Sequence, residues 1–174
     1  MALENALMTG SGLGGEVLFE HAFHNAPIGM ALVGLDGTFL KVNGALCRLA
    51  GYEARKLLSV DFQTITHPED LNADLELLGR LHKGLIPNYE MEKRYIRADG
   101  SIVPVQLSVS MVSTPEGRPL HFIAQVQDLT ARREAEAALE ENARALRAAG
   151  KAALTAMRAA KAAASAKAEF LANM

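Results

Sequence analysis

Two kinds of hydrophobic pattern follow one another along the chain, and they meet close to Asp128. Before that residue, several segments alternate apolar and polar side chains with a period of two, which is typical of half-buried strands. After it, residues 131–174 contain no proline and are rich in helix-favouring alanine, glutamate, lysine and arginine. The pattern therefore predicts a sheet domain that continues directly into one long helix.

The alternation predicts five strands, of which the fourth is the clearest. Valine, leucine or methionine occupies every second position of residues 103–111. Turns that contain glycine or proline, at 34–37, 98–101 and 114–117, join neighbouring strands into hairpins. The predicted strands are residues 28–33, 38–42, 89–96, 103–111 and 120–127.

One short helix is predicted before the first strand, and further helices between the second and third. Asn43 stands where its side chain can cap a helix that Gly51 ends. Pro68 and the acids after it open a longer helix, which Gly84 ends. The predicted helices are residues 16–25, 43–49, 53–58, 61–65 and 68–83. This order predicts an α+β fold, in which a five-stranded antiparallel sheet carries helices on one face and a long C-terminal helix follows.

The predicted organisation has three parts. Residues 1–15 end in a glycine-rich run and are interpreted as a flexible N-terminal segment. A phosphate-binding loop is disfavoured there, because no strand precedes the glycines and no Gly-Lys-Ser/Thr follows them. Residues 16–130 form the sheet domain, and residues 131–174 form the long helix.

Composition narrows the class of protein. The 174 residues suffice for one ordinary domain and an extension, and the net charge of −2 does not favour nucleic acid or an anionic membrane as partner. No apolar run approaches the roughly 20 residues that span a bilayer, and no signal peptide is recognisable. Cys47 is the one cysteine, which excludes an internal disulfide and a thiolate metal cluster. A cytoplasmic protein is therefore expected.

Six short motifs, in this order, resemble those of the PAS domain family. They cover residues 26–30, 42–43, 49–52, 67–71, 97–101 and 128–130, and the resemblance extends over residues 16–130. It implies the PAS fold and a module that senses a small ligand, light or redox state, or that dimerises. The last motif, Asp128-Leu129-Thr130, is similar to the family's Asp-Ile-Thr, which links the last strand to the output helix. The resemblance implies a signal relay at these three residues and a basic partner for Asp128, which the sequence does not identify.

The end of the chain carries a second resemblance. Residues 166–174, Ala-Lys-Ala-Glu-Phe-Leu-Ala-Asn-Met, are similar to the segment just before the phosphoacceptor histidine box of sensor histidine kinases. This implies a PAS sensor that relays a signal to histidine kinase domains in a two-component system, with a response regulator as indirect partner. The chain itself has neither that box nor an ATP-binding domain, so we expect it not to be an enzyme. The alternatives are a free-standing PAS interaction module, or the input of a cyclase or chemoreceptor.

The long helix contains a heptad pattern. Steps of three and four residues from Leu139 meet mainly small apolar side chains, which predicts the seam of a parallel homodimeric coiled coil. Arg144, Arg147 and Lys151 also suit a basic DNA-binding tail, but they lie opposite this seam, and a solvated outer face is favoured. The seam residues are Leu139, Asn142, Leu146, Ala149, Ala153, Ala156, Ala160, Ala163 and Phe170.

The resemblance also bears on cofactors. Light-sensing flavin members need a reactive cysteine where this chain has Phe62. Haem members use a histidine midway along the helix predicted at 68–83, and residues 72–75 contain none. A cysteine-adduct flavin and haem are therefore disfavoured, and the cofactor stays unknown, with none as one alternative. No metal-ligand spacing and no catalytic constellation is found.

The inward face of the predicted sheet is apolar, so it belongs either to a filled core or to a ligand pocket. Asn43 is the one polar candidate, and helix capping explains it. A filled core is favoured, and any ligand is expected to be small and apolar. Glu90, Glu92, Lys93 and Arg94 are interpreted as cross-strand charge pairs. The candidate residues of the core or pocket are Met30, Asn43, Leu46, Phe62, Val103, Val105, Leu107, Phe122, Ala124 and Val126.

Overall fold

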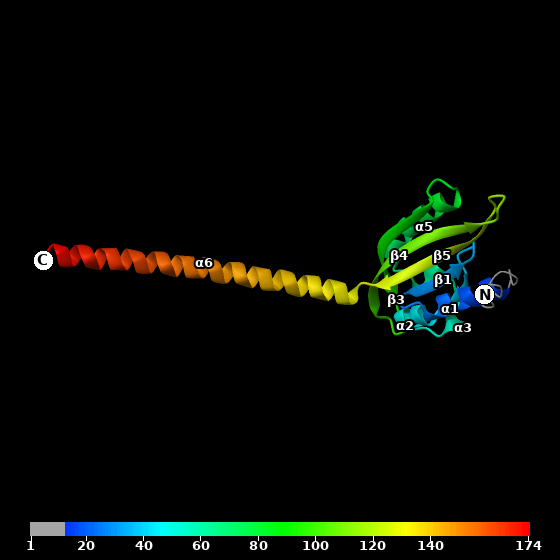
Figure 1. Ribbon diagram of the computed structural model, residues 1–174, viewed down its shortest axis with the longest axis horizontal. Helices are drawn as coiled ribbons and strands as arrows, with labels where there is room; N and C mark the ends of the chain where they lie inside the picture. Colours follow the sequence, from blue (N-terminus) through cyan, green and yellow to red (C-terminus); the bar gives the residue numbers. More distant parts are fainter. Residues whose placement is uncertain (1–12) are drawn as a thin grey trace, which may run out of the picture. The chain divides into compact units, whose positions relative to one another are not determined.

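The structure is a computed structural model, and it describes residues 13–174 (Figure 1). It divides after Thr130 into two compact units. Of the described elements, the first unit contains the strands and the short helices, and the second is the long helix. This helix begins at Thr130, the last residue of the first unit. The predicted flexible N-terminal segment lies outside the described residues as far as residue 12, and residues 13–15 form the first turn of a helix.

The predicted five-stranded antiparallel sheet is confirmed. Its strand order is β2-β1-β5-β4-β3, and every neighbouring pair is antiparallel. The central strand β5 therefore joins the N-terminal hairpin to the C-terminal one, although the two hairpins are far apart in sequence. The strands are β1 (Gly29–Val33), β2 (Phe39–Val42), β3 (Asn88–Ile96), β4 (Ile102–Ser113) and β5 (Pro119–Asp128).

The helices of the first unit form where the sequence supplies caps. Asn43, Asp61 and His67 each accept a hydrogen bond from a backbone N–H in the first turn of the helix that follows. Gly51 ends its helix in the left-handed conformation, with φ of 73°. The helices are α1 (Leu13–Asn25), α2 (Gly44–Ala50), α3 (Ala54–Leu57), α4 (Phe62–Ile65) and α5 (Pro68–His82).

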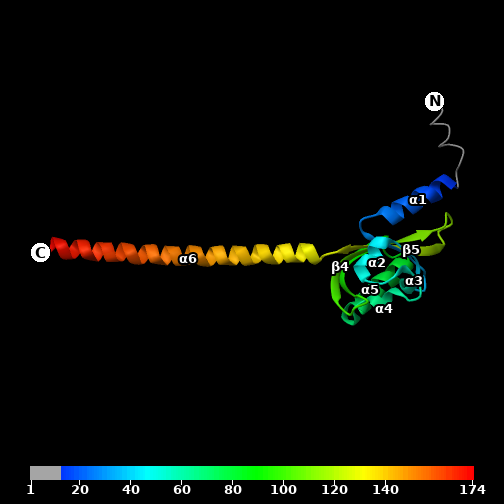
Figure 2. The same cartoon turned by 90° about the horizontal axis from the view of Figure 1, so that it is seen from below.

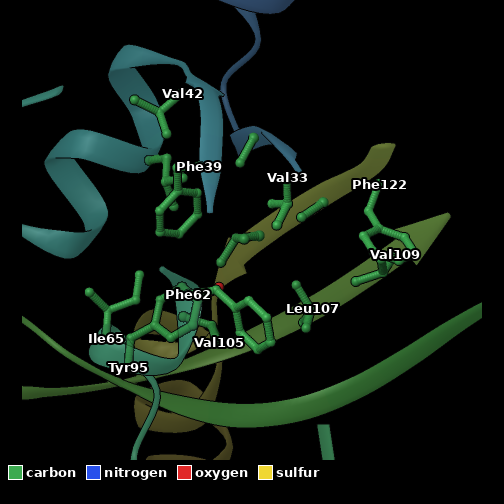
Figure 3. Close-up of a cluster of buried hydrophobic side chains, with 14 of the residues drawn as sticks. Val33, Phe39, Val42, Phe62, Ile65, Tyr95, Val105, Leu107, Val109 and Phe122 are labelled. Carbon is green, nitrogen blue, oxygen red and sulfur yellow. The ribbon is translucent and has the colours of Figure 1, made fainter. Parts of the chain in front are cut away.

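The hydrophobic core lies between the sheet and the helices α2 to α5, which gather around it in Figure 2. Leu46, Leu57, Ile65 and Leu81 bring one buried side chain from each of these helices. From the sheet, alternate residues of β1, β4 and β5 face them, as the period of two requires. Figure 3 shows side chains from several strands and from α4 directed into this shared interior.

The second unit consists of helix α6 (Thr130–Ala172), which confirms the predicted long C-terminal helix. It contains 43 residues, and none of them is buried. In the described part of the chain, no helix combines the length and the apolar character that crossing a membrane needs.

Candidate functional site

A small cavity lies inside the core, between the sheet and the helices. Its volume is about 30 Å³, room for roughly two water molecules. Most of its wall is apolar, but one corner is built from charged and hydroxyl-bearing side chains. The lining residues are Ala31, Val33, Phe39, Leu46, Phe62, Asp74, Leu78, Tyr89, Lys93, Tyr95, Leu107, Val109, Phe122, Ala124 and Val126.

The candidate pocket residues are divided between this cavity and the surrounding core. Val103 and Val105 are fully buried but lie away from the cavity wall. Met30 is half-buried, because it alternates along β1 with the buried Ala31 and Val33. Those that line the cavity are Leu46, Phe62, Leu107, Phe122, Ala124 and Val126.

Asn43 acts as a helix cap, as predicted, and it also joins three segments. Its Oδ1 accepts from the backbone N–H of Leu46 and of Met30, each at 2.9 Å. Its Nδ2 donates to the carbonyls of Phe23 and Ile28, each at 3.0 Å. The side chain is completely buried and uses both of its polar atoms, so it is a structural residue and not a ligand contact.

The polar corner of the cavity was not predicted. Lys93 Nζ lies 2.6 Å from Asp74 Oδ2 and 3.0 Å from Thr66 Oγ1. The hydroxyl of Tyr89 donates to Asp74 Oδ1 at 2.7 Å. The interpretation of Lys93 as part of a cross-strand charge pair is therefore wrong: Val105 lies opposite it on β4, and it pairs with Asp74 of α5. The side chains of Lys93 and Asp74 are each only 1% exposed.

Burial governs the electrostatics of this corner. Desolvation lowers the pKa of Lys93, and the neighbouring Asp74 opposes that shift. Burial and the same carboxylate raise the pKa of Tyr89, so its hydroxyl stays protonated and can donate. The Lys93 ammonium also lies 4.7 Å from the ring centre of Tyr95 and 5.4 Å from that of Phe62, where aromatic faces favour a cation. These contacts favour a paired ammonium and carboxylate in this corner.

A sequence signal for this corner exists. Lys93 shares its strand parity with Tyr89 and Tyr95, which are both buried, whereas Arg94 takes the opposite parity. On α5, Asp74 follows Leu71 by three residues and precedes Leu78 by four, so it lies on the apolar side of that helix. The neighbouring Leu75 is exposed, whereas Asp74 is buried.

The predicted relay residues form a compact junction between β5 and α6. Asp128 Oδ1 accepts from the backbone N–H of Thr130 at 2.7 Å, and its Oδ2 lies 3.4 Å from Arg97. Leu129 is buried, and its N–H donates to the carbonyl of Pro104 at 2.9 Å. Arg97, the residue that follows β3, is the basic partner that the sequence did not identify.

The predicted seam residues all lie exposed on α6 of the single chain. The large ones are Leu139, Leu146 and Phe170, with 70%, 76% and 66% of their surface exposed. Among residues 13–174, no group of three or more histidine, cysteine or acidic side chains is arranged to hold a metal ion.

Comparison with known proteins assigns the chain to a family. A model of the PAS domain matches residues 27–131. A probable diguanylate cyclase of Escherichia coli, DgcE, is 46% identical over 114 residues, which are 66% of this chain and 10% of that protein. The C4-dicarboxylate transport sensor protein DctS of Rhodobacter capsulatus is 30% identical over 122 residues, which are 69% of this chain and 19% of that protein. The matched part thus spans at most about a fifth of the length of either relative.

The fold has solved counterparts. The crystal structure of a PAS domain from a two-component sensor histidine kinase superposes with a TM-score of 0.54 at 27% identity, covering 66% of this chain and 98% of that one. Both the sequence and the fold therefore support one assignment, in which the sheet domain is a signal-sensing module: the chain belongs to the PAS domain family.

Proposed function

We propose that this chain is a cytoplasmic sensor and dimerisation module that relays a signal through a coiled coil of α6 to a histidine kinase. The observation that carries the proposal is the direct continuation of the sheet domain into a helix of 43 residues through the junction at Asp128. The resemblance of residues 166–174 to the segment before a histidine box supports the kinase as output.

The geometry of the junction supports such a relay. One carboxylate, that of Asp128, contacts both Arg97, which directly follows β3, and the first N–H group of α6. A small shift of β3 therefore changes the contact that holds the start of the helix. At about 1.5 Å per residue, the 43 residues of α6 carry such a change over roughly 65 Å.

In a dimer, the change at the junction would act on a coiled coil of two α6 helices. Two parallel α6 helices would bury the exposed seam residues against each other, and alanine at most of these positions allows close contact. Alanine also buries little apolar area, so the seam holds its register weakly. A weakly held register can rotate or slide at a small cost in free energy, which suits the transmission of a signal.

A diguanylate cyclase output is the second candidate. It is favoured by the 46% identity to the probable cyclase DgcE, a higher identity than the 30% of the sensor relative DctS. That match covers 114 residues, so at least a third of this chain lies outside it. The kinase proposal draws its support from the end of α6.

The test joins residues 1–174 to the catalytic region of a histidine kinase, beginning at its histidine box, and in parallel to a cyclase catalytic domain. We expect autophosphorylation of the kinase fusion to change at least about five-fold in Asp128→Ala, with thermal unfolding of the sheet domain unchanged. Removal of seven residues, 147–153, keeps the heptad phase and should keep the activity, whereas removal of 147–150 should abolish its regulation. A kinase fusion insensitive to Asp128→Ala and to the four-residue deletion, beside a cyclase fusion that responds to both, would favour the cyclase.

A further inference from the structure

The cavity beside Lys93 combines features that together define a class of ligand. We propose that it binds a short-chain neutral alcohol, whose hydroxyl group meets Lys93 and Asp74 and whose alkyl chain lies against the apolar wall. The role of this alcohol as the sensed signal rests on the proposed sensor function, whereas its binding does not.

The first argument is the charge of the site. Lys93 and Asp74 form an ion pair at 2.6 Å, so the polar corner has no net charge. Both side chains are buried, and the rest of the wall is apolar. A ligand with a carboxylate or an ammonium group would bring one unbalanced charge into this interior, which is costly. The pair therefore selects a neutral ligand.

The second argument is the hydrogen-bonding capacity that the protein leaves in this corner. An ammonium group has three N–H donors, and among the described residues Lys93 donates to Asp74 Oδ2 and Thr66 Oγ1. Each carboxylate oxygen of Asp74 receives one such bond, from Lys93 or Tyr89, and has a lone pair to spare. The corner thus offers one donor and additional acceptors. A hydroxyl group both accepts and donates, so it fits this corner better than a carbonyl group or a hydrocarbon.

The third argument is size. The cavity of about 30 Å³ admits roughly two water-sized groups, which is too small for an aromatic ring. Leu107, Val109 and Phe122 line its wall and can cover the carbons of a two- or three-carbon chain. Water fits the same space, but a water molecule gains nothing from the apolar wall, whereas each methylene group does. A short alcohol therefore matches both the polar corner and the apolar wall.

The experiment titrates the full chain with ethanol, acetate and ethylammonium, and follows amide chemical shifts by NMR. We expect ethanol to cause saturable shifts at cavity residues such as Ala31 and Ala124, with a dissociation constant no tighter than about 1 mM, because so few atoms bind. Acetate and ethylammonium should bind at least about ten-fold more weakly. Ethanol shifts that rise linearly without saturation, or equal affinity for the three probes, would overturn the proposal.

Two variants and a matched control keep this test independent of folding. Lys93→Met with Asp74→Asn removes both charges at similar volume, and it should weaken ethanol binding at least about five-fold. Ala124→Val fills the cavity and should abolish saturation while the fold is retained. Arg94→Met removes a cation from the next position of β3, which does not line the cavity, and should bind ethanol like the wild type. Unchanged binding in both cavity variants would place the ethanol site elsewhere and overturn the proposal.

The outcome for the sensor function is read separately, from the kinase fusion in the presence of ethanol. Saturable binding with unchanged autophosphorylation would support the site and contradict the alcohol as signal. Regulation of the fusion through Asp128 without any ethanol binding would support the relay and overturn the alcohol site.

Discussion

The sheet domain and helix α6 differ in how their apolar side chains are buried. The domain encloses its own core, in which large side chains such as Phe23 and Phe122 are 1% exposed. In α6 no residue is buried, although Leu139 and Leu146 are as apolar as the core leucines. The stability of the domain is therefore a property of one chain, whereas most helical stability in proteins comes from packing that a single α6 does not have. A substitution in one region should therefore leave the stability of the other region unchanged.

The largest effect is expected from breaking the buried ion pair of the domain. Lys93→Met leaves the Asp74 carboxylate buried without its cation, and we expect the free energy of unfolding to fall by about 3–5 kcal/mol. Urea denaturation at neutral pH measures this change. The double variant with Asp74→Asn should recover part of the loss, since it removes the unpaired charge. A loss under about 1 kcal/mol in the single variant would contradict the buried geometry.

The next effect concerns the buried cap. Asn43→Ala removes four hydrogen bonds and leaves the buried N–H of Leu46 and the partly buried N–H of Met30 without their acceptor, so we expect a loss of about 2–4 kcal/mol. Asn25 is the matched control, because it is an exposed asparagine with one side-chain bond, to the carbonyl of His21. Asn25→Ala should change the same quantity by less than about 0.5 kcal/mol. Equal losses in both variants would refute the structural role of Asn43.

A smaller effect, with a definite pH dependence, is expected where α5 meets β3 at the surface. Asp70 accepts from the backbone N–H and the guanidinium of Arg94, and these bonds lower the pKa of its carboxyl group below the ordinary 3.8. A depressed folded-state pKa contributes stability that is present above about pH 4 and is lost as the pH falls through the folded value. Asp70→Asn should therefore cost about 1–2 kcal/mol at pH 7, since the pair is partly solvated, and less at pH 2, where part of that contribution is lost.

Chemical denaturation of both proteins across this pH range makes the measurement. Glu76→Gln, at an exposed position of the same helix, serves as the control and should change the stability by less than about 0.5 kcal/mol at either pH. A difference between Asp70→Asn and the wild type that is independent of pH would show that the carboxylate charge is not the cause.

The smallest effect on the domain is expected from the seam of α6. Leu146→Lys should leave the unfolding of the domain unchanged within about 0.5 kcal/mol, because this side chain is 76% exposed in the single chain. In the proposed dimer the same residue is buried, so sedimentation should show a shift from dimer to monomer. Arg147→Ala, on the predicted outer face, should remain a dimer. Identical masses for the wild type and Leu146→Lys would contradict the seam.

The strands and helices were predictable because local chemistry determines them. The period of two in β4, the cap at Asn43 and the glycine at the end of α2 each act within a few residues. The polar corner of the cavity was missed because Lys93 and Arg94 are adjacent cations on one strand, and composition alone assigns both to the surface. The alternation along β3 distinguishes them, because Lys93 shares the buried positions with Tyr89 and Tyr95 and Arg94 does not. This distinction requires the tyrosines to be recognised as marking the buried side of the strand.

The partner of Asp128 illustrates a second limit of prediction from the sequence. Arg97 follows β3 and Asp128 ends β5, so their contact depends on the register of both strands with β4, which lies between them. Val105 pairs with Lys93 on one side and with Asp128 on the other. Such a register involves three strands at once, and no short sequence motif encodes it.

The exposed state of α6 has an evolutionary consequence. Because residues after Thr130 supply no buried side chain, a gene fusion at this point would exchange the output without disturbing the core. The Asp128 carboxylate and the buried Leu129 would stay with the sensor and could start whichever helix came next. Recombination at this boundary should therefore be tolerated, and similar domains do occur in proteins named as a cyclase and as a transport sensor.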